Sequence, residues 1–388
     1  MKNRELAVIA LLVFVTSLFT RSVDPVVPQI ADGLLVDVGT AALLSTAFAL
    51  PYAIVQPVLG ALADMMSKTR LMSICLVLLV LSAVVSALAP NFTVLAISRV
   101  VAGIASGGIF PTSLAIAGDR IPMAQRQIAI SRLLAATMTG NLLGASLAGV
   151  VGDLAGWRAV FIVVGSMGAL CIVAIVIGFR SSPPETPKGF DLSTLGPNYR
   201  AIFGNPLAKY CFGAVFIESV VVFGIFPHMA ALLHQAGESR ASIAGIVLAG
   251  FGIGAVVYTF CVGWLLSLLG ERKMMIGGGL IMAAFCLILT WRLPWPLEFA
   301  NFAMLGFGFY WLHGCIQVYA TELAPAARGS TMALHSASFF LGQAVGPVVY
   351  GLGFSYVGAT PLLVAGAVII AAVGYVCASR LHHQKTKT

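Results

Sequence analysis

Asp24 is an acidic residue inside a long apolar stretch, residues 6–30, where an unpaired charge would be costly. Arg21 lies three residues earlier on the same face of a helix and can form an ion pair with Asp24. Burial favours the neutral form of a carboxyl group and a nearby guanidinium favours its ionised form, so a conformational change can switch protonation. Asp24 is therefore the first candidate for coupling to protons. A static pair that locks one end of a helix bundle is the alternative.

Arg99 is a second cation inside an apolar stretch, residues 93–117. Asp24 and Arg99 each lie about six residues, or roughly 9 Å, from the same predicted side of the membrane. Because their depths match, Asp24 can pair with Arg99 as well as with Arg21.

Glu218 is the rival proton site, in the second half of the chain. It lies about eight residues, or roughly 12 Å, from the nearer end of the stretch 210–233. His313 has a broadly similar depth in a later stretch, and Tyr310 precedes it on the same helix. An acid at this depth could take up a proton or bind a cationic substrate. The alternatives are a neutral acid bonded to the backbone, a structural polar contact at His313, and a Tyr310 that faces lipid or a neighbouring helix.

The elements that carry these residues are predicted to lie in lipid. The chain has 388 residues, 59% apolar and 9% charged, whereas soluble domains carry roughly a quarter charged residues. A membrane-spanning helix needs about 20 mostly apolar residues. The sequence predicts an all-α membrane protein with twelve such helices: 6–30, 41–63, 71–88, 93–117, 128–151, 158–179, 210–233, 241–265, 273–291, 297–320, 329–355 and 360–379.

The net charge of +8 is explained by the loops between these helices. With the N-terminus in the cytoplasm, sixteen Lys and Arg residues lie on the cytoplasmic side and three on the other. Cytoplasmic loops of membrane proteins carry such an excess. We therefore expect a multi-pass protein of the cell inner (plasma) membrane with both termini in the cytoplasm, and no nucleic acid partner.

The two halves of the chain repeat each other. At a shift of 203 residues, glycine, basic, acidic and proline positions coincide: Gly60/Gly263, Arg70/Lys273, Asp119/Glu322 and Pro122/Pro325. At a shift of 202 residues, a series of glycines coincides: Gly140/Gly342, Gly144/Gly346 and Gly149/Gly351. Repeated halves are typical of alternating-access transporters. We expect two pseudo-symmetric six-helix bundles, 1–180 and 210–388, joined by a cytoplasmic linker, 181–209.

Two motifs add a resemblance to a known family. They are Gly60-Ala-Leu-Ala-Asp64-Met-Met-Ser-Lys68-Thr-Arg70 and Arg99-Val-Val-Ala-Gly103-Ile-Ala-Ser-Gly107-Gly108. With twelve helices and a repeat, the chain resembles the major facilitator superfamily, especially its drug:proton antiporter and sugar-efflux branch. The resemblance implies that Gly60, Asp64 and Arg70 form a cytoplasmic clamp, with Asp64 facing the start of helix 329–355. Met65 and Ser67 depart from the family's basic residue and glycine.

A glycine pattern in helix 128–151 resembles the antiporter motif, with Ala145 in place of its proline. Small residues at this spacing allow helices to approach closely. We therefore expect helix packing, not substrate contact, from Gly140, Gly144, Gly149, Gly342, Gly346 and Pro347.

These features predict a secondary transporter, functional as a monomer, that exports a small amphipathic compound in exchange for protons. A symporter or facilitator that imports a sugar or an organic acid is the alternative. The sequence lacks a GxxxxGK[ST] motif for ATP, so we expect an ion or substrate gradient to drive transport. An enzyme is not expected, because HExxH and GxSxG motifs and a Cys/His cluster are absent from the sequence. The seven cysteines lie in apolar stretches without a CxxC pair, so we expect no metal and no cofactor.

Overall fold

A computed structural model of the chain describes residues 3–65, 67–121, 123–180, 195–324 and 328–381. Within these ranges all regular elements are helices. Two compact units form, and both are discontinuous in sequence. Unit 1 contains the described residues of Met1–Phe190 and Pro227–Leu248, and unit 2 those of Asp191–Phe226 and Ala249–Thr388.

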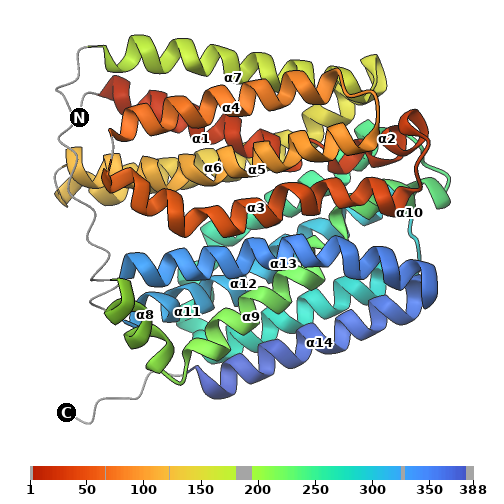
Figure 1. Ribbon diagram of the computed structural model, residues 1–388. Coiled ribbons are helices and arrows are strands. Elements are labelled where there is room, and N and C mark those ends of the chain that lie inside the picture. Colours follow the sequence, from red (N-terminus) through yellow and green to blue (C-terminus); the bar gives the residue numbers. More distant parts are fainter. Residues whose placement is uncertain (1–2, 66, 122, 181–194, 325–327, 382–388) are drawn as a thin grey trace. The chain divides into compact units, whose positions relative to one another are not determined.

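Unit 1 is built on the helices of the first repeat: α1 (Asn3–Arg21), η1 (Asp24–Val26), α2 (Val27–Leu34), α3 (Val38–Met65), α4 (Lys68–Ala87), α5 (Phe92–Arg120), α6 (Met123–Ala155) and α7 (Trp157–Phe179). It also includes α10 (Met229–Gln235) and the first residues of α11 (Ala241–Leu289). Helix α3 packs along α5, α4 packs between α5 and α7, and α1 packs along α6 (Figure 1). These contacts bring α1, α3 and α5 together around Asp24.

Unit 2 surrounds α9 (Ala208–Phe223). Helix α9 packs against three neighbours: α12 (Trp295–Glu322), α13 (Arg328–Tyr356) and α14 (Ala359–Arg380). A short helix, α8 (Leu195–Gly204), lies within the predicted linker 181–209, whose residues 181–194 are outside the described ranges. The division of the chain at this linker stays a prediction.

The number of membrane-spanning helices agrees with the twelve predicted from the sequence, because α11 contains two spans. Ten helical segments among the described residues are long and apolar enough to span a membrane, and α11 counts once among them. Its 49 residues extend about 74 Å, more than twice the hydrocarbon thickness of about 30 Å. The left-handed conformation of Gly270 divides α11 into two spans. Helix α12 has 28 residues, long enough to span, and although it is not among the ten it completes twelve.

Two predicted helices are interrupted, which corrects the sequence prediction of continuous helices over 6–30 and 210–233. Helix α1 ends at Arg21 before η1, and α9 ends at Phe223 before η3 (Phe226–His228). Both short 3₁₀ segments contain a proline, Pro25 and Pro227, at positions 202 residues apart. Proline lacks the backbone N–H that a continuous helix requires, so equivalent prolines interrupt the first helix of each repeat.

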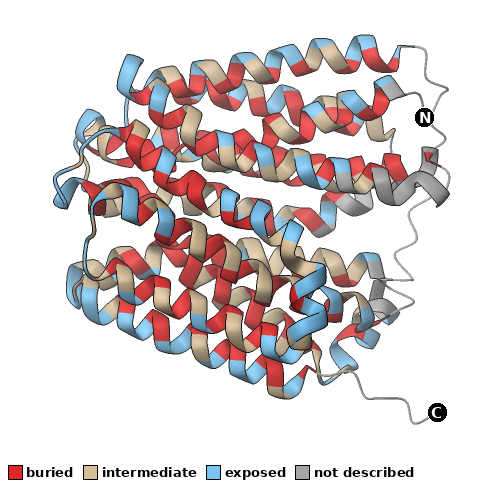
Figure 2. Cartoon of the chain, turned by 180° about the vertical axis from the view of Figure 1, so that it is seen from behind, coloured by how far each residue is buried: buried red, intermediate tan, exposed pale blue. Residues whose placement is uncertain are grey.

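Exposed apolar side chains mark the surfaces that contact lipid. Leu170 and Val176 on α7 and Val368 on α14 are each more than 60% exposed. Buried and exposed positions alternate along these peripheral helices (Figure 2). A helix satisfies its own backbone hydrogen bonds, so such apolar faces are stable in a bilayer but not in water.

Candidate functional site

Asp24 is completely buried at the point where α1 ends and η1 begins. Its Oδ2 lies 3.4 Å from Nη1 of Arg21, the partner that the helical spacing allowed. Its Oδ1 accepts a hydrogen bond of 2.8 Å from the Ser45 hydroxyl on α3. The carboxylate therefore links the end of α1 to α3 and has a cation beside it.

Arg99, on α5, is also buried but has other direct partners. Its Nη2 donates to the carbonyl oxygen of Phe19 at 3.2 Å, and its guanidinium lies 4.5 Å from the centre of the Phe48 ring. An arginine over an aromatic face is stabilised by the electrons of the ring. Its charge also acts on Asp24, although no ion pair joins Arg99 to Asp24 among the described residues.

Glu218 and His313 are in direct contact in unit 2, joined by Oε1 of Glu218 and Nδ1 of His313. Glu218 projects from α9 and His313 from α12, and both are buried. Among the described residues, Oε2 of Glu218 has no hydrogen-bond partner. This second carboxylate thus has one free oxygen and a partner that can itself gain or lose a proton.

His335, on α13, extends this contact to a third helix and was not among the site residues predicted from the sequence. Its ring centre lies 5.0 Å from that of His313, and its Nε2 has no partner among the described residues. Phe309 stacks on His313 at 4.7 Å, and Tyr310 lies 6.5 Å from it. A second histidine inside an apolar stretch of the same repeat was the available signal. We call Glu218, His313 and His335 the acid–histidine cluster.

The glycines singled out from the sequence lie where helix backbones meet. A Cβ atom at Gly140 would lie 2.4 Å from the Phe14 carbonyl oxygen, and Gly144 similarly faces α1. In unit 2, Gly342 and Gly346 face α9 in the same way, and Pro347 follows them inside α13. Side chains at these glycines would force the helices apart.

The predicted cytoplasmic clamp is described only in part. The surroundings of Gly60 and of the Asp64 side chain lie outside what the structure describes, and Arg70 is exposed. The hydroxyl of Ser67, which replaces the family's glycine, accepts the Arg70 backbone N–H at 3.3 Å and caps α4. The clamp stays a prediction.

Two repeats of membrane-spanning helices, each with a buried carboxylate that contacts another helix, define a class of protein: the secondary transporters. The chain belongs to the Major Facilitator Superfamily, whose family model matches residues 9–243 and 214–387. It is therefore a multi-pass membrane transporter of small molecules.

Relatives match along nearly the whole chain. An uncharacterized MFS-type transporter of Bacillus subtilis (strain 168), YfhI, is 25% identical over 370 residues, covering 94% of this chain and 90% of that protein. The quinolone resistance protein NorA of Staphylococcus aureus (strain MRSA252) is 25% identical over 391 residues, covering 99% of each.

A solved structure shares the fold. The crystal structure of a bacterial homolog to the human lysosomal transporter Spinster, in an inward-facing and unoccupied conformation, superposes with a TM-score of 0.75. It covers 98% of both chains at 19% sequence identity.

Proposed function

We propose that this chain exports small amphipathic compounds in exchange for protons, and that Glu218 is the group that takes up and releases the proton. The observation that carries the proposal is the contact of a completely buried Glu218 with His313. An ionisable group at membrane depth is costly, and a proton path is one of the functions that retain it.

The surroundings of the two buried carboxylates favour Glu218 over Asp24, which the sequence had put first. Asp24 is in direct contact with Arg21, whose positive charge does not depend on taking up a proton. For Glu218, the basic residue in direct contact is His313, which is cationic only when it binds a proton itself. Neutralising Glu218 therefore requires a proton, on the carboxyl group or on the imidazole.

This arrangement can accept a proton without rebuilding its contacts. A ring nitrogen of histidine acts as a donor or an acceptor according to the tautomer, so it can stay bonded to Oε1 in either protonation state. The free Oε2 is then available to the proton. Loss of this charge would change which conformation of the carrier is favoured, which is what coupled exchange requires.

The expected substrate class follows from aromatic rings around the cluster. Phe223 lies 5.4 Å from Phe309 and 5.2 Å from Phe339, and Phe339 lies 5.4 Å from His313. Flat apolar surfaces beside a titratable acid suit a compound with both aromatic and polar groups. The similarity to a protein named for quinolone resistance supports the same class.

Transport into everted membrane vesicles tests the proposal. A panel of fluorescent aromatic cations, neutral dyes, sugars and organic acids is offered with and without an inward-acid pH gradient. We expect accumulation of aromatic amphiphiles that requires the gradient. The proposal would be rejected if sugars or organic acids accumulated instead, or if a substrate equilibrated without an effect of the gradient. Either result would favour the importer or facilitator alternative.

We also propose that the protein works as a monomer in the inner membrane with both termini in the cytoplasm. The distribution of basic residues supports this orientation. In a cysteine-free background, Ser193→Cys should react with a membrane-impermeant maleimide in everted vesicles but not in intact cells. Reaction in intact cells would reverse the orientation.

A further inference from the structure

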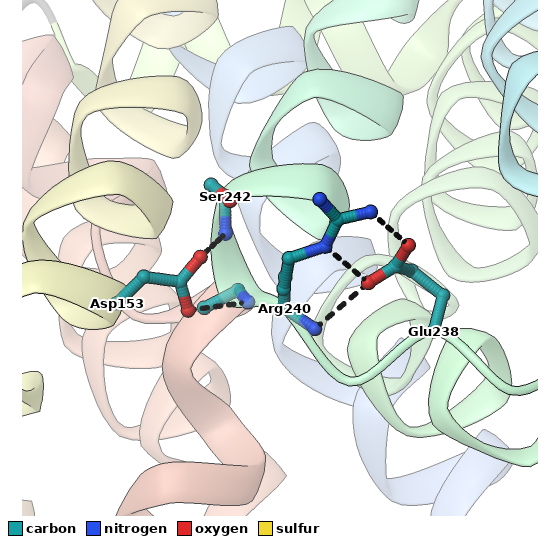
Figure 3. Close-up of polar contacts among 5 residues, drawn as sticks. Asp153, Glu238, Arg240 and Ser242 are labelled. Atoms are coloured by element: carbon teal, nitrogen blue, oxygen red, sulfur yellow. Dashed lines mark hydrogen bonds and ion pairs between the residues drawn. The ribbon is translucent and has the colours of Figure 1, made fainter.

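Asp153, near the end of α6, is bonded to the beginning of α11, and both parts belong to unit 1. Its Oδ1 accepts the backbone N–H of Ala241 and its Oδ2 that of Ser242, each at 2.8 Å (Figure 3). The first N–H groups of a helix have no partner within the helix, and the helix dipole favours a negative charge there. One carboxylate thus binds two such groups of a helix from the other repeat.

Close backbone packing supports this contact along the next two turns of the helices. A Cβ atom at Gly149 would lie 2.3 Å from the Ala241 carbonyl oxygen, and one at Gly245 would lie 2.4 Å from that of Ala145. The Ser146 hydroxyl lies 3.5 Å from the carbonyl oxygen of Gly245. The end of α6 and the start of α11 therefore fit together only in a narrow range of positions.

Arg240, the basic residue nearby, acts on Asp153 only through its charge and forms its hydrogen bonds with Glu238. Arg240 turns to Glu238, with Nε–Oε1 and Nη2–Oε2 distances of 2.8 and 2.6 Å (Figure 3). These bonds hold the pKa of the Glu238 carboxyl below its usual range. Arg240 is exposed, with 61% of its side chain accessible. Glu238 and Asp153 are therefore two nearby carboxylates, of which Asp153 joins the two repeats.

We propose that Asp153 is a latch that holds one closed state of the transporter and must be released once in every transport cycle. Alternating access moves the two repeats relative to each other, and the latch joins the last part of α6 to the first turn of α11 across them. The proposal rests on transport by this family and is independent of proton exchange at Glu218. In the predicted orientation it acts on the outer side.

The family resemblance implies a counterpart at the opposite side of the membrane. There Asp64, at the end of α3, is expected to face the start of α13. The first repeat would then contribute both carboxylates, each to the first turn of a helix in the second repeat. One contact would have to break while the other forms. Asp153 would therefore shift the equilibrium between the outward-closed and the inward-closed conformations.

Cysteine accessibility tests the latch without relying on transport. In a cysteine-free background Ser146→Cys places a small reporter between α6 and α11, and intact cells are treated with a membrane-impermeant maleimide. We expect Asp153→Ala to raise the labelling rate about fivefold, the factor that corresponds to loss of a typical helix cap. Asp153→Asn, which keeps the side-chain shape, should give a smaller increase.

Glu238→Gln is the matched control, because it removes a carboxylate of the same segment that does not contact α6. It should leave the labelling rate unchanged. An unchanged rate in both Asp153 variants, or an equal increase in Glu238→Gln, would overturn the proposal.

A reversible cross-link tests whether the latch must open. Asp153→Cys with Ser242→Cys is oxidised, and transport is measured on protein shown to be cross-linked. We expect transport to stop and to return after reduction. Transport at the uncross-linked rate would show that these helix ends need not separate, whatever couples the carrier to protons.

Discussion

Asp24 and Glu218 are both completely buried, one in each unit, yet they differ in the partners that hold them. Asp24 has one guanidinium at 3.4 Å and a hydroxyl group at 2.8 Å. Glu218 has one imidazole and a free oxygen among the described residues. The first carboxylate is held by a permanent charge, whereas the partner of the second changes charge with protonation.

This difference separates two uses of a buried acid. Arginine stays charged at any physiological pH, so its contact with Asp24 is suited to hold α1 against α3. An acid next to histidine can change charge without leaving its partner, and is suited to exchange protons. We therefore expect substitutions in the acid–histidine cluster to act on coupling, and substitutions around Asp24 to act on stability.

The largest effect is expected from Glu218→Gln, which keeps the size of the side chain and removes its proton exchange. Transport driven by a pH gradient should fall to the level of vesicles without the protein, while substrate binding to purified protein persists. Glu298→Gln is the control, since Glu298 is also a buried acid of unit 2, bonded to Asn301 at 3.1 Å. Proton-driven transport by Glu218→Gln would move the coupling site elsewhere.

His313→Gln should have the next largest effect, because glutamine can hydrogen-bond to Glu218 but cannot titrate near neutral pH. We expect gradient-driven transport to fall about tenfold, the effect of one hydrogen bond to a charged group. The pH profile of the remaining activity should change shape, which a purely structural role would not cause. An unchanged profile at reduced rate would leave His313 a packing residue.

Asp24→Asn should have a smaller effect on coupling, within about fivefold, since the amide oxygen can still accept the Ser45 hydroxyl while the negative charge beside Arg21 is removed. Its melting temperature in detergent should fall by a few degrees. Asp32→Asn, at an exposed position of α2, serves as the control. If Asp24→Asn alone abolishes gradient-driven transport, the roles assigned to the two carboxylates are exchanged.

Ser45→Ala should have the smallest effect, because it removes one hydrogen bond and leaves the pair with Arg21 in place. We expect a loss of about 1 kcal/mol of unfolding free energy and a change in transport of less than about twofold. Thermal unfolding of the purified protein measures the first and vesicle transport the second. A larger loss of transport than in Asp24→Asn would mean that the hydroxyl group has a role beyond holding Asp24.

Much of the architecture followed from the sequence alone, because it depends on properties that are local along the chain. Stretches of about 20 apolar residues predict spanning helices wherever the chain is surrounded by lipid, and glycine and proline positions reveal the repeat. The pairing of Asp24 with Arg21 is local too, since residues three apart share a helix face. The family resemblance of the Asp64 and Arg99 motifs is likewise carried by adjacent residues.

Only the tertiary structure decided which helices present their polar side chains to one another. Hydropathy places a residue at a depth in the membrane but does not set the rotation of its helix about its own axis. Three contacts depend on that rotation: the packing of Glu218, His313 and His335, the contact of Arg99 with Phe48, and the capping of α11 by Asp153. The positions at which α1 and α9 end were also decided by the tertiary structure. A proline weakens a helix, but the surrounding packing determines where the helix breaks.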